Sequence, residues 1–487
     1  MPRVTVTELQ HYRLETLCEL FGASISELAP SLQYLLESRV LEVVPGGTVY
    51  LGDIDSSGDS TQIKPIYRGA AEKSVEYRFR FVGVVVHNNY VIRVVPKYVA
   101  SSSQEVCELH MRLALRALRT LGNQQHLIPL FGENGNEGEV NGIISVSLSL
   151  LTDYLTNGPY LSVSERLGSE NGETDWCRTI ENQSPIFAGS FPIYFDPVKR
   201  LRSRDQDSFM RRLHLAIVQA ASDTLSDLGL LDVLELPRLQ GISAGLHRMG
   251  PTVELLRAIS AHDRIEYGVR NRQLLSMFTA FLNAANDRYT VGPESLATFG
   301  TSSFNLVWEH ACGIVFRNEL DEPVVSTVAQ GNQRTRTLRE LIDFPEWHGS
   351  DYFGHFSVFS GSTLIPDVVF VERSTNPALV ILDAKYYNFS LLRNAGVSGA
   401  PGVADIGKQY LYSIALRGAR EALSIKTTKN CFVFPGVHSG VRNLGEVSWG
   451  FLDRMGQEKI QLRSVSVEDI FFAMFQGSRL EADYLRL

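Results

Sequence analysis

The chain has 487 residues, of which 44% are hydrophobic and 21% are charged, the composition of a soluble globular protein. A chain of this length predicts two or three domains with sizeable cores. The formal net charge of −8 argues against a protein that coats nucleic acid through bulk positive charge, although it leaves a local binding cleft open. No apolar run approaches the roughly 20 residues of a membrane-spanning helix, so we expect no membrane association.

The cysteines and the first residues of the chain bear on its compartment. The five cysteines are scattered, odd in number and free of any Cys-x-x-Cys pair. This pattern favours a reducing compartment and disfavours a zinc site. The first residues contain no apolar core of a signal peptide. We therefore predict a cytoplasmic location.

The first third of the chain predicts a mixed α+β region over residues 1–165. Residues 1–45 are expected to be mainly helical, because apolar side chains recur at helical spacing. The extended runs at residues 40–44 and 46–51 predict a hairpin after the helices, with a small winged-helix-like unit as the alternative. Two β-rich runs follow, residues 77–86 and 90–96, and the short polar turn between them predicts a hairpin. A long helix is expected over residues 104–121.

The middle of the chain, residues 166–297, predicts a mostly helical region. Helical spacing is clearest over residues 206–230 and 251–286. The composition then changes near residues 298–303, which we take as a domain boundary. Residues 298–487 are accordingly expected to form a separate domain.

This last segment alternates between helical and extended patterns. The expected order is a helix at 304–316, a hairpin at 363–387, a helix at 404–420, strands at 430–435, 446–452 and 459–464, and a helix at 466–476. Such alternation is typical of the α/β class, in which helices cover the faces of a central sheet. The chain as a whole is therefore predicted to be a multi-domain α/β protein with a mixed α+β N-terminal region.

Two aspartates and a lysine in the expected hairpin carry the strongest functional signal. Apolar, β-branched runs flank the turn-forming residues 373–377, and Asp367 and Asp383 each lie eight residues from Thr375. Directly opposed residues in a hairpin have Cβ atoms about 5 Å apart, where like charges repel unless a cation lies between them. Lys385 lies two residues beyond Asp383 and projects from the same face of the strand. The sequence thus predicts two carboxylates and an ammonium group on one side of a small sheet.

A third carboxylate, Glu309, lies at the edge of the core stripe of the helix expected at residues 304–316. From that edge it is able to lean toward the sheet. Three carboxylates would make an oxygen-rich site suited to Mg²⁺, which binds few carboxylates and keeps several waters. Taken alone, a glutamate on a helix flank is more often a solvated charge.

The helix after the hairpin carries Asp405, Gln409 and Tyr412 at positions i, i+4 and i+7, which share one helix face. A polar face beside the site would position the backbone of a ligand. A stripe that faces solvent explains the same pattern equally well.

These residues resemble the PD-(D/E)xK nuclease superfamily. The match consists of Pro366-Asp367 followed by Asp383-Ala384-Lys385, with Glu309 upstream and a helix bearing Gln409 and Tyr412 downstream. The short motif is common by itself, but its two halves lie on adjacent apolar strands, in the order of that family. In this setting the downstream helix would position DNA through Gln409 and Tyr412.

The resemblance implies a PD-(D/E)xK fold for residues 298–487 and assigns roles within it. Asp367, Asp383 and Glu309 would hold Mg²⁺, with Mn²⁺ as a substitute, and Lys385 would assist the attacking water. The physical chemistry agrees, because a metal ion lowers the pKa of a bound water and a nearby ammonium stabilises developing negative charge.

The resemblance narrows to the nuclease subunits of McrC-type, modification-linked restriction systems. The matching core is residues 381–387 preceded by residues 364–369. Looser matches at residues 81–98, 175–180 and 184–194 are similar to the LlaJI branch of that group.

This resemblance implies a two-component system that cuts DNA. A separate, McrB-like AAA+ GTPase would recognise or translocate DNA, and this chain would cut it within a hetero-oligomer. Residues 1–295 would dock on the motor by their position in the chain. The chain contains no Gly-x-x-x-x-Gly-Lys-Ser/Thr phosphate loop, which fits a motor encoded by another chain.

The leading prediction is a Mg²⁺-dependent DNA endonuclease subunit of a restriction, or phage-defence, system. The alternative is an assembly subunit that activates the partner GTPase and has little or no nuclease activity of its own. A third hypothesis, an unrelated hydrolase, is disfavoured because the dispersed histidines show no metal-ligand spacing.

Overall fold

A computed structural model describes residues 2–45, 75–87, 90–122, 143–168, 173–205, 207–234, 236–290, 296–329, 332–393 and 396–487. The chain divides into two compact units. One consists chiefly of residues 135–299, and the other combines residues 2–134 with residues 300–487. Within the described ranges, every helix is too short or too polar to cross a membrane.

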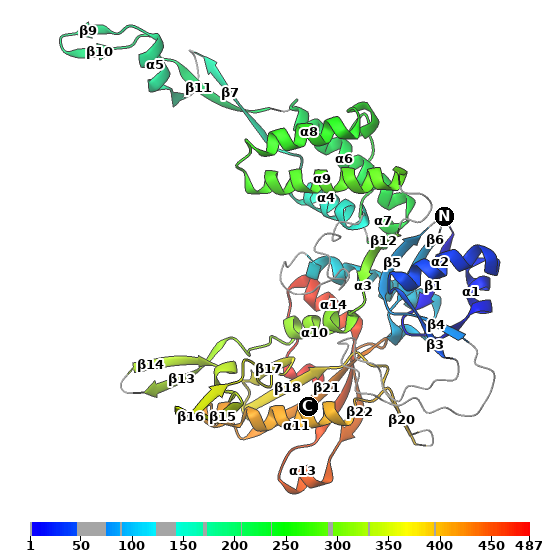
Figure 1. Cartoon of the computed structure of the whole chain (residues 1–487). Helices are drawn as coiled ribbons and strands as arrows, with labels where there is room; N and C mark the ends of the chain where they lie inside the picture. Colours follow the sequence, from blue (N-terminus) through cyan, green and yellow to red (C-terminus); the bar gives the residue numbers. More distant parts are fainter. Residues whose placement is uncertain are drawn as a thin grey trace. The chain divides into compact units, whose positions relative to one another are not determined.

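The unit of residues 135–299 contains a helical bundle (Figure 1). The helices of the bundle are α4 (Ile143–Asn157), α6 (Phe209–Asp227), α7 (Leu230–Val233), α8 (Thr252–Asp263) and α9 (Val269–Thr290). A further helix of the unit, α5 (Trp176–Asn182), lies apart from them beside β9 and β10 (Figure 1). Helix α4 packs against α6 and α9, and α8 packs against α9. Along α6, the buried residues Met210, Leu213, Ile217, Ala221 and Leu225 recur every three or four positions. One stripe of this helix therefore forms its share of the bundle core.

Two small antiparallel sheets complete this unit. Their strands are β7 (Ser162–Gly168), β8 (Glu173–Thr174), β9 (Ile186–Ala188), β10 (Phe191–Ile193) and β11 (Lys199–Asp205). The first sheet has the order β7–β11–β8, and β9 and β10 form a hairpin. The hairpin exposes the rings of Phe187 and Phe191.

The other unit begins with a four-stranded sheet of order β1–β6–β5–β12. Its strands are β1 (Arg3–Thr7), β5 (Val82–His87), β6 (Tyr90–Val95) and β12 (Leu296–Thr301). Strand β6 pairs in parallel with β1 and antiparallel with β5. Every residue of β5 is buried, as expected for an interior strand.

A smaller sheet of order β2–β4–β3 and three helices accompany this sheet. The strands are β2 (Tyr12–Arg13), β3 (Leu41–Pro45) and β4 (Val75–Phe79), and the helices are α1 (Leu14–Phe21), α2 (Ile25–Glu37) and α3 (Gln104–Gly122). Helix α2 begins at a capping box, in which the Ser24 backbone N–H donates to the Glu27 carboxylate over 2.8 Å. A 3₁₀ turn, η1 (Lys97–Val99), connects β6 to α3.

The same unit contains a five-stranded sheet of order β17–β18–β21–β23–β22. Its strands are β17 (Val368–Glu372), β18 (Ala378–Ala384), β21 (Thr427–Gly436), β22 (Val441–Val447) and β23 (Ile460–Ser466). The three central strands, β18, β21 and β23, run parallel, and the two outer strands run antiparallel to their neighbours. All seven residues of β18 are buried.

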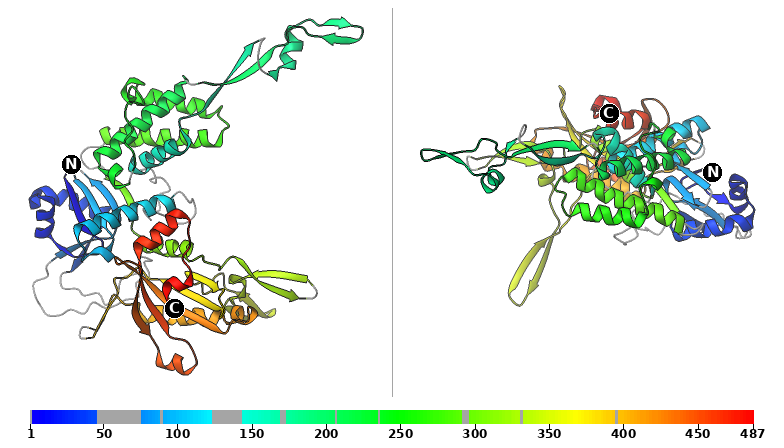
Figure 2. Two further views of the ribbon diagram at one scale, coloured as in Figure 1. Left: turned by 180° about the vertical axis from the view of Figure 1, so that it is seen from behind. Right: turned by 90° about the horizontal axis from the view of Figure 1, so that it is seen from above.

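Helices cover both faces of this sheet (Figures 1 and 2). They are α10 (Phe304–Val315), α11 (Val403–Ala415), α12 (Arg417–Ala422), α13 (Gly450–Arg454), α14 (Val467–Gln476) and the terminal turn α15 (Ala482–Leu485). On one face, Tyr412 and Leu416 pack against Val369 and Ile381. On the other, α10 contacts β18 and α14 contacts β23. The Trp308 indole N–H of α10 donates to the Val433 carbonyl over 3.3 Å.

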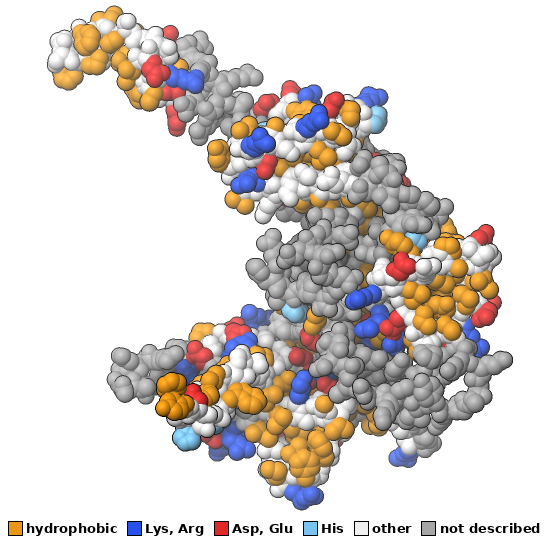
Figure 3. All heavy atoms as spheres, viewed as in Figure 1, with side chains coloured by type: hydrophobic (Ala, Val, Ile, Leu, Met, Phe, Trp, Pro, Cys, Tyr) orange, Lys and Arg blue, Asp and Glu red, His pale blue; other side chains and the backbone are white. Residues whose placement is uncertain are grey.

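Short hairpins extend from the five-stranded sheet. Their strands are β13 (Pro323–Ala329), β14 (Asn332–Thr337), β15 (Glu346–Asp351), β16 (Gly354–Phe359), β19 (Ser390–Leu392) and β20 (Gly396–Ser398), and a 3₁₀ turn, η3 (Arg339–Leu341), follows β14. Tyr352 and Phe353, at the turn between β15 and β16, are almost fully exposed. Hydrophobic side chains gather on the surface there and over α13 (Figure 3).

The structure confirms the mixed α/β architecture with several sheets and most of the expected elements. Strands β5 and β6 form the hairpin predicted after residue 77, and α3 matches the helix predicted at 104–121. Two predictions are wrong. Residues 1–13 contain strands β1 and β2 where helix was expected, and residues 446–452 are not one strand, because β22 ends at Val447 and α13 begins at Gly450. Strand β3 lies at the extended run predicted after the two helices, and residues 46–51 lie outside the described residues.

The two compact units differ from the three predicted segments in one respect. The predicted boundary at 297/298 lies close to the division at Phe299/Gly300. Residues 2–134, however, group with residues 300–487 and not with the segment that follows them. The reason is tertiary, since α3 packs on α10 and α14 although about 200 to 370 residues separate them.

At two glycine positions, an added methyl group is expected to have opposite effects on the free energy of unfolding. A Cβ on Gly300, in β12, would lie 2.2 Å from the Val82 carbonyl oxygen and 2.4 Å from the Phe81 ring. A Cβ on Gly313, in α10, would meet nothing within 4 Å. We expect Gly300→Ala to lower the free energy of unfolding by about 1–3 kcal/mol. Gly313→Ala is expected to raise it by about 0.5–1 kcal/mol in chemical denaturation. Equal effects of the two substitutions would contradict the packing described for β12.

Candidate active site

The pairing of β17 with β18 brings two aspartates together. Val368 lies opposite Leu382, and the next position in this register places Asp367 opposite Asp383. This confirms the predicted hairpin and its register. The Asp367 Oδ2 atom accepts a hydrogen bond of 2.9 Å from the backbone N–H of Ala384, which fixes its side chain against the end of β18.

Burial and mutual repulsion govern the ionisation of this pair. Asp383 is only 4% exposed, and burial, followed by the neighbouring Asp367 carboxylate, raises its pKa well above the usual range. Burial also raises the pKa of Asp367, to which the charge of Glu309 adds, whereas a hydrogen bond with Asp383 opposes the rise. The two side chains therefore retain a proton more readily than isolated aspartates do.

Lys385 lies between two carboxylates. Its Nζ atom is 3.2 Å from Asp383 Oδ2 and 3.1 Å from Asp405 Oδ1, on α11. Burial lowers the pKa of this lysine, but the carboxylates of Asp383 and Asp405 outweigh burial and raise it. The backbone N–H of Lys385 donates to the Val433 carbonyl over 2.9 Å, so the residue continues the ladder between β18 and β21. A charged ammonium group is thus held beside the aspartate pair.

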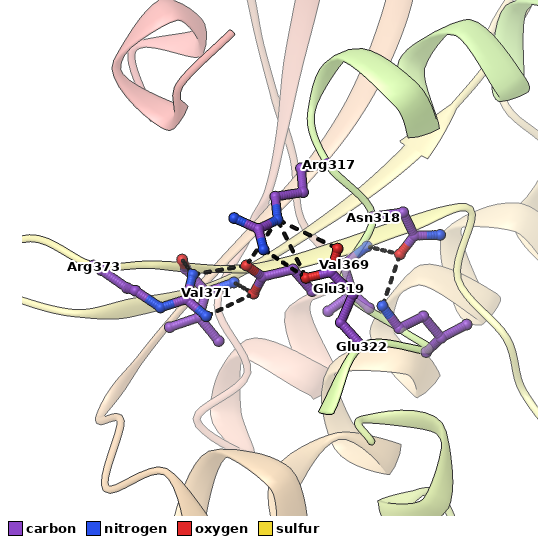
Figure 4. A network of polar contacts seen from close by, with 8 residues as sticks. Arg317, Asn318, Glu319, Glu322, Val369, Val371 and Arg373 are labelled. Atoms are coloured by element: carbon purple, nitrogen blue, oxygen red, sulfur yellow. Dashed lines mark hydrogen bonds and ion pairs between the residues drawn. The ribbon is translucent and has the colours of Figure 1, made fainter. Parts of the chain in front are cut away.

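A polar network stabilises the strand that follows Asp367 (Figure 4). The Asn318 amide donates to the Asp367 carbonyl over 2.9 Å and accepts from the Val369 N–H over 3.1 Å. Glu319, only 1% exposed, accepts from the Val371 N–H over 3.0 Å and from Arg373 over 2.7 Å. These contacts satisfy the outer edge of β17, where no further strand pairs among the residues that the structure describes. They also fix the backbone of Asp367 in place.

Glu309 lies half-buried on α10, beside the predicted core stripe. The stripe itself is confirmed, since Phe304, Val307, Trp308, Ala311 and Val315 are all buried. The charge of Glu309 contributes to the raised pKa of Asp367, which places the glutamate within electrostatic range of the pair. Burial, followed by the charges of Asp367 and Glu309, raises the pKa of the Cys312 thiol, which lies one turn beyond Glu309 on α10.

Helix α11 differs from its predicted role. Gln409 is fully buried, and its amide donates to the side chain of Asn430 in β21. The Asn430 amide in turn donates to the Gln409 carbonyl over 3.1 Å. Tyr412 packs in the core under β17 and β18, and burial, followed by the charges of Asp383 and Asp367, raises its pKa. These positions join the helix to the sheet, which leaves Gln409 no access to DNA.

Asp405 is the site residue whose role the sequence analysis missed. Its Oδ1 atom is the second partner of Lys385, and its Oδ2 atom accepts from the Gly402 N–H over 3.2 Å at the start of α11. An aspartate in the first turn of a helix commonly serves as a cap. A capping role accounts for the contact of Oδ2 with the Gly402 N–H. The contact of Oδ1 with Lys385 depends on how α11 packs on β18.

The donors at this site are hard oxygen ligands of the kind that Mg²⁺ prefers. Asp367 and Asp383 face each other, and a cation between them would relieve their repulsion. Among the residues that the structure describes, no group of three or more His, Cys, Asp or Glu side chains is already arranged to hold a metal ion. The aspartate pair is thus assembled, whereas Glu309 acts on it through its charge.

A second motif, Gly241-Ile-Ser-Ala-Gly245, was not weighed in the sequence analysis. It has the Gly-x-Ser-x-Gly pattern of hydrolase nucleophile elbows, which require a strand-to-helix turn. Here residues 241–244 form a series of bends without an adjoining strand. The Ser243 hydroxyl accepts from the Gly245 N–H over 3.2 Å. The local structure therefore does not support a serine nucleophile.

A model of the LlaJI restriction endonuclease family matches residues 81–467 of this chain. The chain belongs to the LlaJI restriction endonuclease family. The match covers the aspartate pair, Lys385, Glu309 and Asp405, together with most of both compact units. The LlaJI assignment made from the sequence is confirmed.

Similar proteins are known for this LlaJI-family chain. It is 26% identical over 433 residues to the type II restriction enzyme BsuMI component YdjA of Bacillus subtilis, covering 85% of this chain and 84% of that protein. It also aligns with a chain of the Thermococcus gammatolerans half-complex of McrB AAA+ hexamers with bound McrC. That alignment covers 98% of this chain and 100% of the other, at 14% identity and a TM-score of 0.37.

A second solved structure, the McrBC complex of Thermococcus gammatolerans, aligns with 63% of the LlaJI-family chain. The alignment covers 84% of that chain, at 13% identity and a TM-score of 0.24. At such TM-scores, neither structural likeness carries an argument about fold or function.

The aspartate pair predicts that the negative charge of Asp367 lowers the free energy of unfolding. The raised pKa of Asp367 means that its ionised form destabilises the fold, and this cost appears as pH rises from the unfolded-state pKa of about 4. We expect Asp367→Asn to raise the free energy of unfolding by about 1–2 kcal/mol and Tm by about 2–4 °C near pH 8, with little change near pH 4.

Thermal denaturation at both pH values measures this effect. Asp351→Asn is the matched control, because Asp351 is exposed at the end of β15 and faces no second carboxylate among the described contacts. A Tm that falls in Asp367→Asn near pH 8 would show that repulsion does not dominate the pair.

Proposed function

We propose that this chain is the Mg²⁺-dependent DNA endonuclease subunit of its restriction system and hydrolyses phosphodiester bonds. Membership of the LlaJI family supports a role in a restriction system. The observation that carries the nuclease activity is the placement of Lys385 Nζ 3.2 Å from an aspartate that faces a second aspartate across a hairpin. A PD-(D/E)xK fold for residues 298–487 is part of this proposal, since the order of the carboxylates and the lysine matches that superfamily.

The residues of the site divide the work of cleavage. Asp367 and Asp383 would hold Mg²⁺, with Glu309 as a further carboxylate near them. Bound Mg²⁺ lowers the pKa of a coordinated water and screens the charge of the phosphate, and Mn²⁺ is expected to substitute. Lys385 presents a charged ammonium group that stabilises negative charge on the attacking oxygen or on the phosphate. Asp405 is the second carboxylate that contacts that ammonium group, at 3.1 Å.

A separate AAA+ GTPase completes the proposed system as a hetero-oligomer. The chain contains no phosphate loop of its own, so a motor has to be supplied by another chain. In this division of labour the partner finds and moves DNA, and the present chain cuts it. Stimulation of the partner's GTP turnover is a second role that the same assembly would allow.

Substitution of the site residues tests the nuclease proposal. We expect Asp383→Ala to abolish cleavage of a restricted plasmid in the presence of Mg²⁺ and the partner GTPase. Lys385→Ala is expected to slow cleavage about 100-fold or more, because it removes a fixed charge from the reacting phosphate. Initial rates of plasmid linearisation measure both effects.

The control variant is Lys459→Ala. Lys459 forms an exposed ion pair with Glu446 at the start of β23, at the opposite end of the parallel strands from Lys385. Exposed pairs of this kind contribute little to stability, so cleavage should be unchanged. Wild-type cleavage by Asp383→Ala and Lys385→Ala would rule out the proposed site, and GTP turnover of the partner with each variant would then show whether activation is the chain's main role.

Metal removal provides an independent test. The carboxylates bind a cation only when deprotonated, and their pKa values are raised, so metal affinity should increase as pH rises. Chelation with EDTA is expected to stop cleavage, and Mg²⁺ or Mn²⁺ to restore it. Titration of Mn²⁺ by calorimetry near pH 6 and pH 8 should give the tighter binding at the higher pH. Cleavage that persists in EDTA would exclude a metal-dependent mechanism.

A further inference from the structure

The residue that follows Lys385 belongs to a buried polar cluster on the other side of the sheet. Lys385 pairs with Asp405 of α11 on one face of the sheet, whereas Tyr386 packs against α10 on the other. Its ring packs against Phe304 of α10, with ring centroids 5.3 Å apart. Tyr386 is only 4% exposed, although it carries a hydroxyl group.

The hydroxyl group of Tyr386 bonds to a distant part of the sequence. It donates to Glu8 Oε2 over 2.6 Å, and Glu8 is itself buried directly after β1. The same carboxylate oxygen accepts the backbone N–H of Lys97 over 3.1 Å. Burial, followed by the charge of Glu8, raises the pKa of Tyr386, so the hydroxyl keeps its proton and remains the donor.

Cationic and aromatic groups enclose this contact. The Lys97 ammonium lies 4.8 Å from the centre of the Tyr386 ring and 5.6 Å from that of Tyr387. The Tyr98 ring meets Tyr386 edge-on at 6.0 Å, and its hydroxyl lies 3.3 Å from His110 Nδ1 of α3. Burial lowers the pKa of His110 to about 4, so this histidine stays neutral near pH 7.

These contacts tie the end of β18 to the N-terminal sheet within one compact unit. Lys385 is bonded to β21 through its N–H, and the Tyr387 N–H donates back to the Lys385 carbonyl over 3.0 Å. Tyr386, held between these two residues, sets the direction in which the chain leaves the sheet. Lys385 and Tyr386 share a planar peptide unit. Anchoring of the Tyr386 ring therefore restrains the backbone of Lys385.

We propose that Glu8 and Tyr386 are positioning residues that hold the Lys385 ammonium in place for cleavage, so that the N-terminal sheet forms part of the nuclease machinery. The inference rests on the proposed function and adds that the N-terminal sheet controls the position of Lys385. Groups behind a reacting side chain commonly fix its orientation, and small misplacements of a reacting group slow a reaction strongly. A partner that contacts residues 2–134 would thereby influence the position of Lys385 through the hydrogen bond between Glu8 and Tyr386 and through the packing of the Tyr386 ring.

A double-mutant cycle on the full chain, assayed with its partner GTPase and Mg²⁺, tests this proposal. Tyr386→Phe removes only the hydroxyl oxygen, and Glu8→Ala removes the acceptor. Each variant is expected to lower the maximal single-turnover cleavage rate about 10- to 100-fold, with an unchanged DNA concentration for half-maximal rate. The double variant should lose no more than either single variant, because all three lack the same contact.

Two further variants separate positioning from folding. Glu8→Gln keeps an acceptor oxygen for Tyr386 and Lys97, and it should retain the wild-type rate within about threefold. Tyr484→Phe removes a tyrosine-to-carboxylate bond of 2.8 Å, to Asp469, elsewhere in the same unit. It should leave cleavage unchanged while lowering Tm about as much as Tyr386→Phe does.

The outcomes distinguish this inference from the proposed function. If Lys385→Ala loses cleavage but Tyr386→Phe cleaves like the wild type, the positioning role is wrong and the nuclease stands. If the losses of Tyr386→Phe and Glu8→Ala add in the double variant, or if only the required DNA concentration changes, the two residues act separately and the proposal also fails. If Glu8→Ala does not fold, Tyr386→Phe and Glu8→Gln together decide the matter. If Lys385→Ala cleaves normally, the proposed function is at fault.

Discussion

The antiparallel pairing of β17 with β18 is the constraint on which the candidate site depends. It places Asp367 and Asp383 directly opposite each other, where like charges repel. The surroundings offset that repulsion only in part, through the Ala384 N–H and the ammonium of Lys385. A fold that keeps two buried carboxylates in this arrangement sacrifices stability, a pattern that is common at functional sites and uncommon elsewhere in a core.

The rest of the unit holds this strained pair in place from several directions. Strand β18 is an interior strand, bonded to β17 on one side and to β21 on the other, so its backbone has little freedom. The free edge of β17 is satisfied by Asn318 and Glu319, which follow α10. Helix α11 contributes Asp405 to Lys385. The geometry of three charged side chains thus depends on contacts with β17, β21, α11 and the segment after α10.

Sequence reasoning succeeded where the interactions are local and periodic. The apolar alternation and the turn at residues 373–377 defined the hairpin and its register, because the side-chain period of a strand leaves one register that buries the apolar face. Helix α10 was recognised from its apolar stripe in the same way. The polar face of α11 was misread, because Gln409 bonds to Asn430 inside the core, and helical spacing alone does not distinguish a buried polar pair from an exposed one.

The sequence by itself therefore determined the hairpin and the facing aspartates, since both depend on residues that are close along the chain. It also determined the LlaJI assignment, which rests on short stretches that are recognised one by one. Tertiary structure alone decided that Asp405 meets Lys385 and that Glu8 bonds to Tyr386, 378 positions away. It also decided that residues 2–134 form one unit with residues 300–487. The physical reason is that packing between elements creates these contacts, and neither hydrophobic period nor local spacing records which elements will pack together.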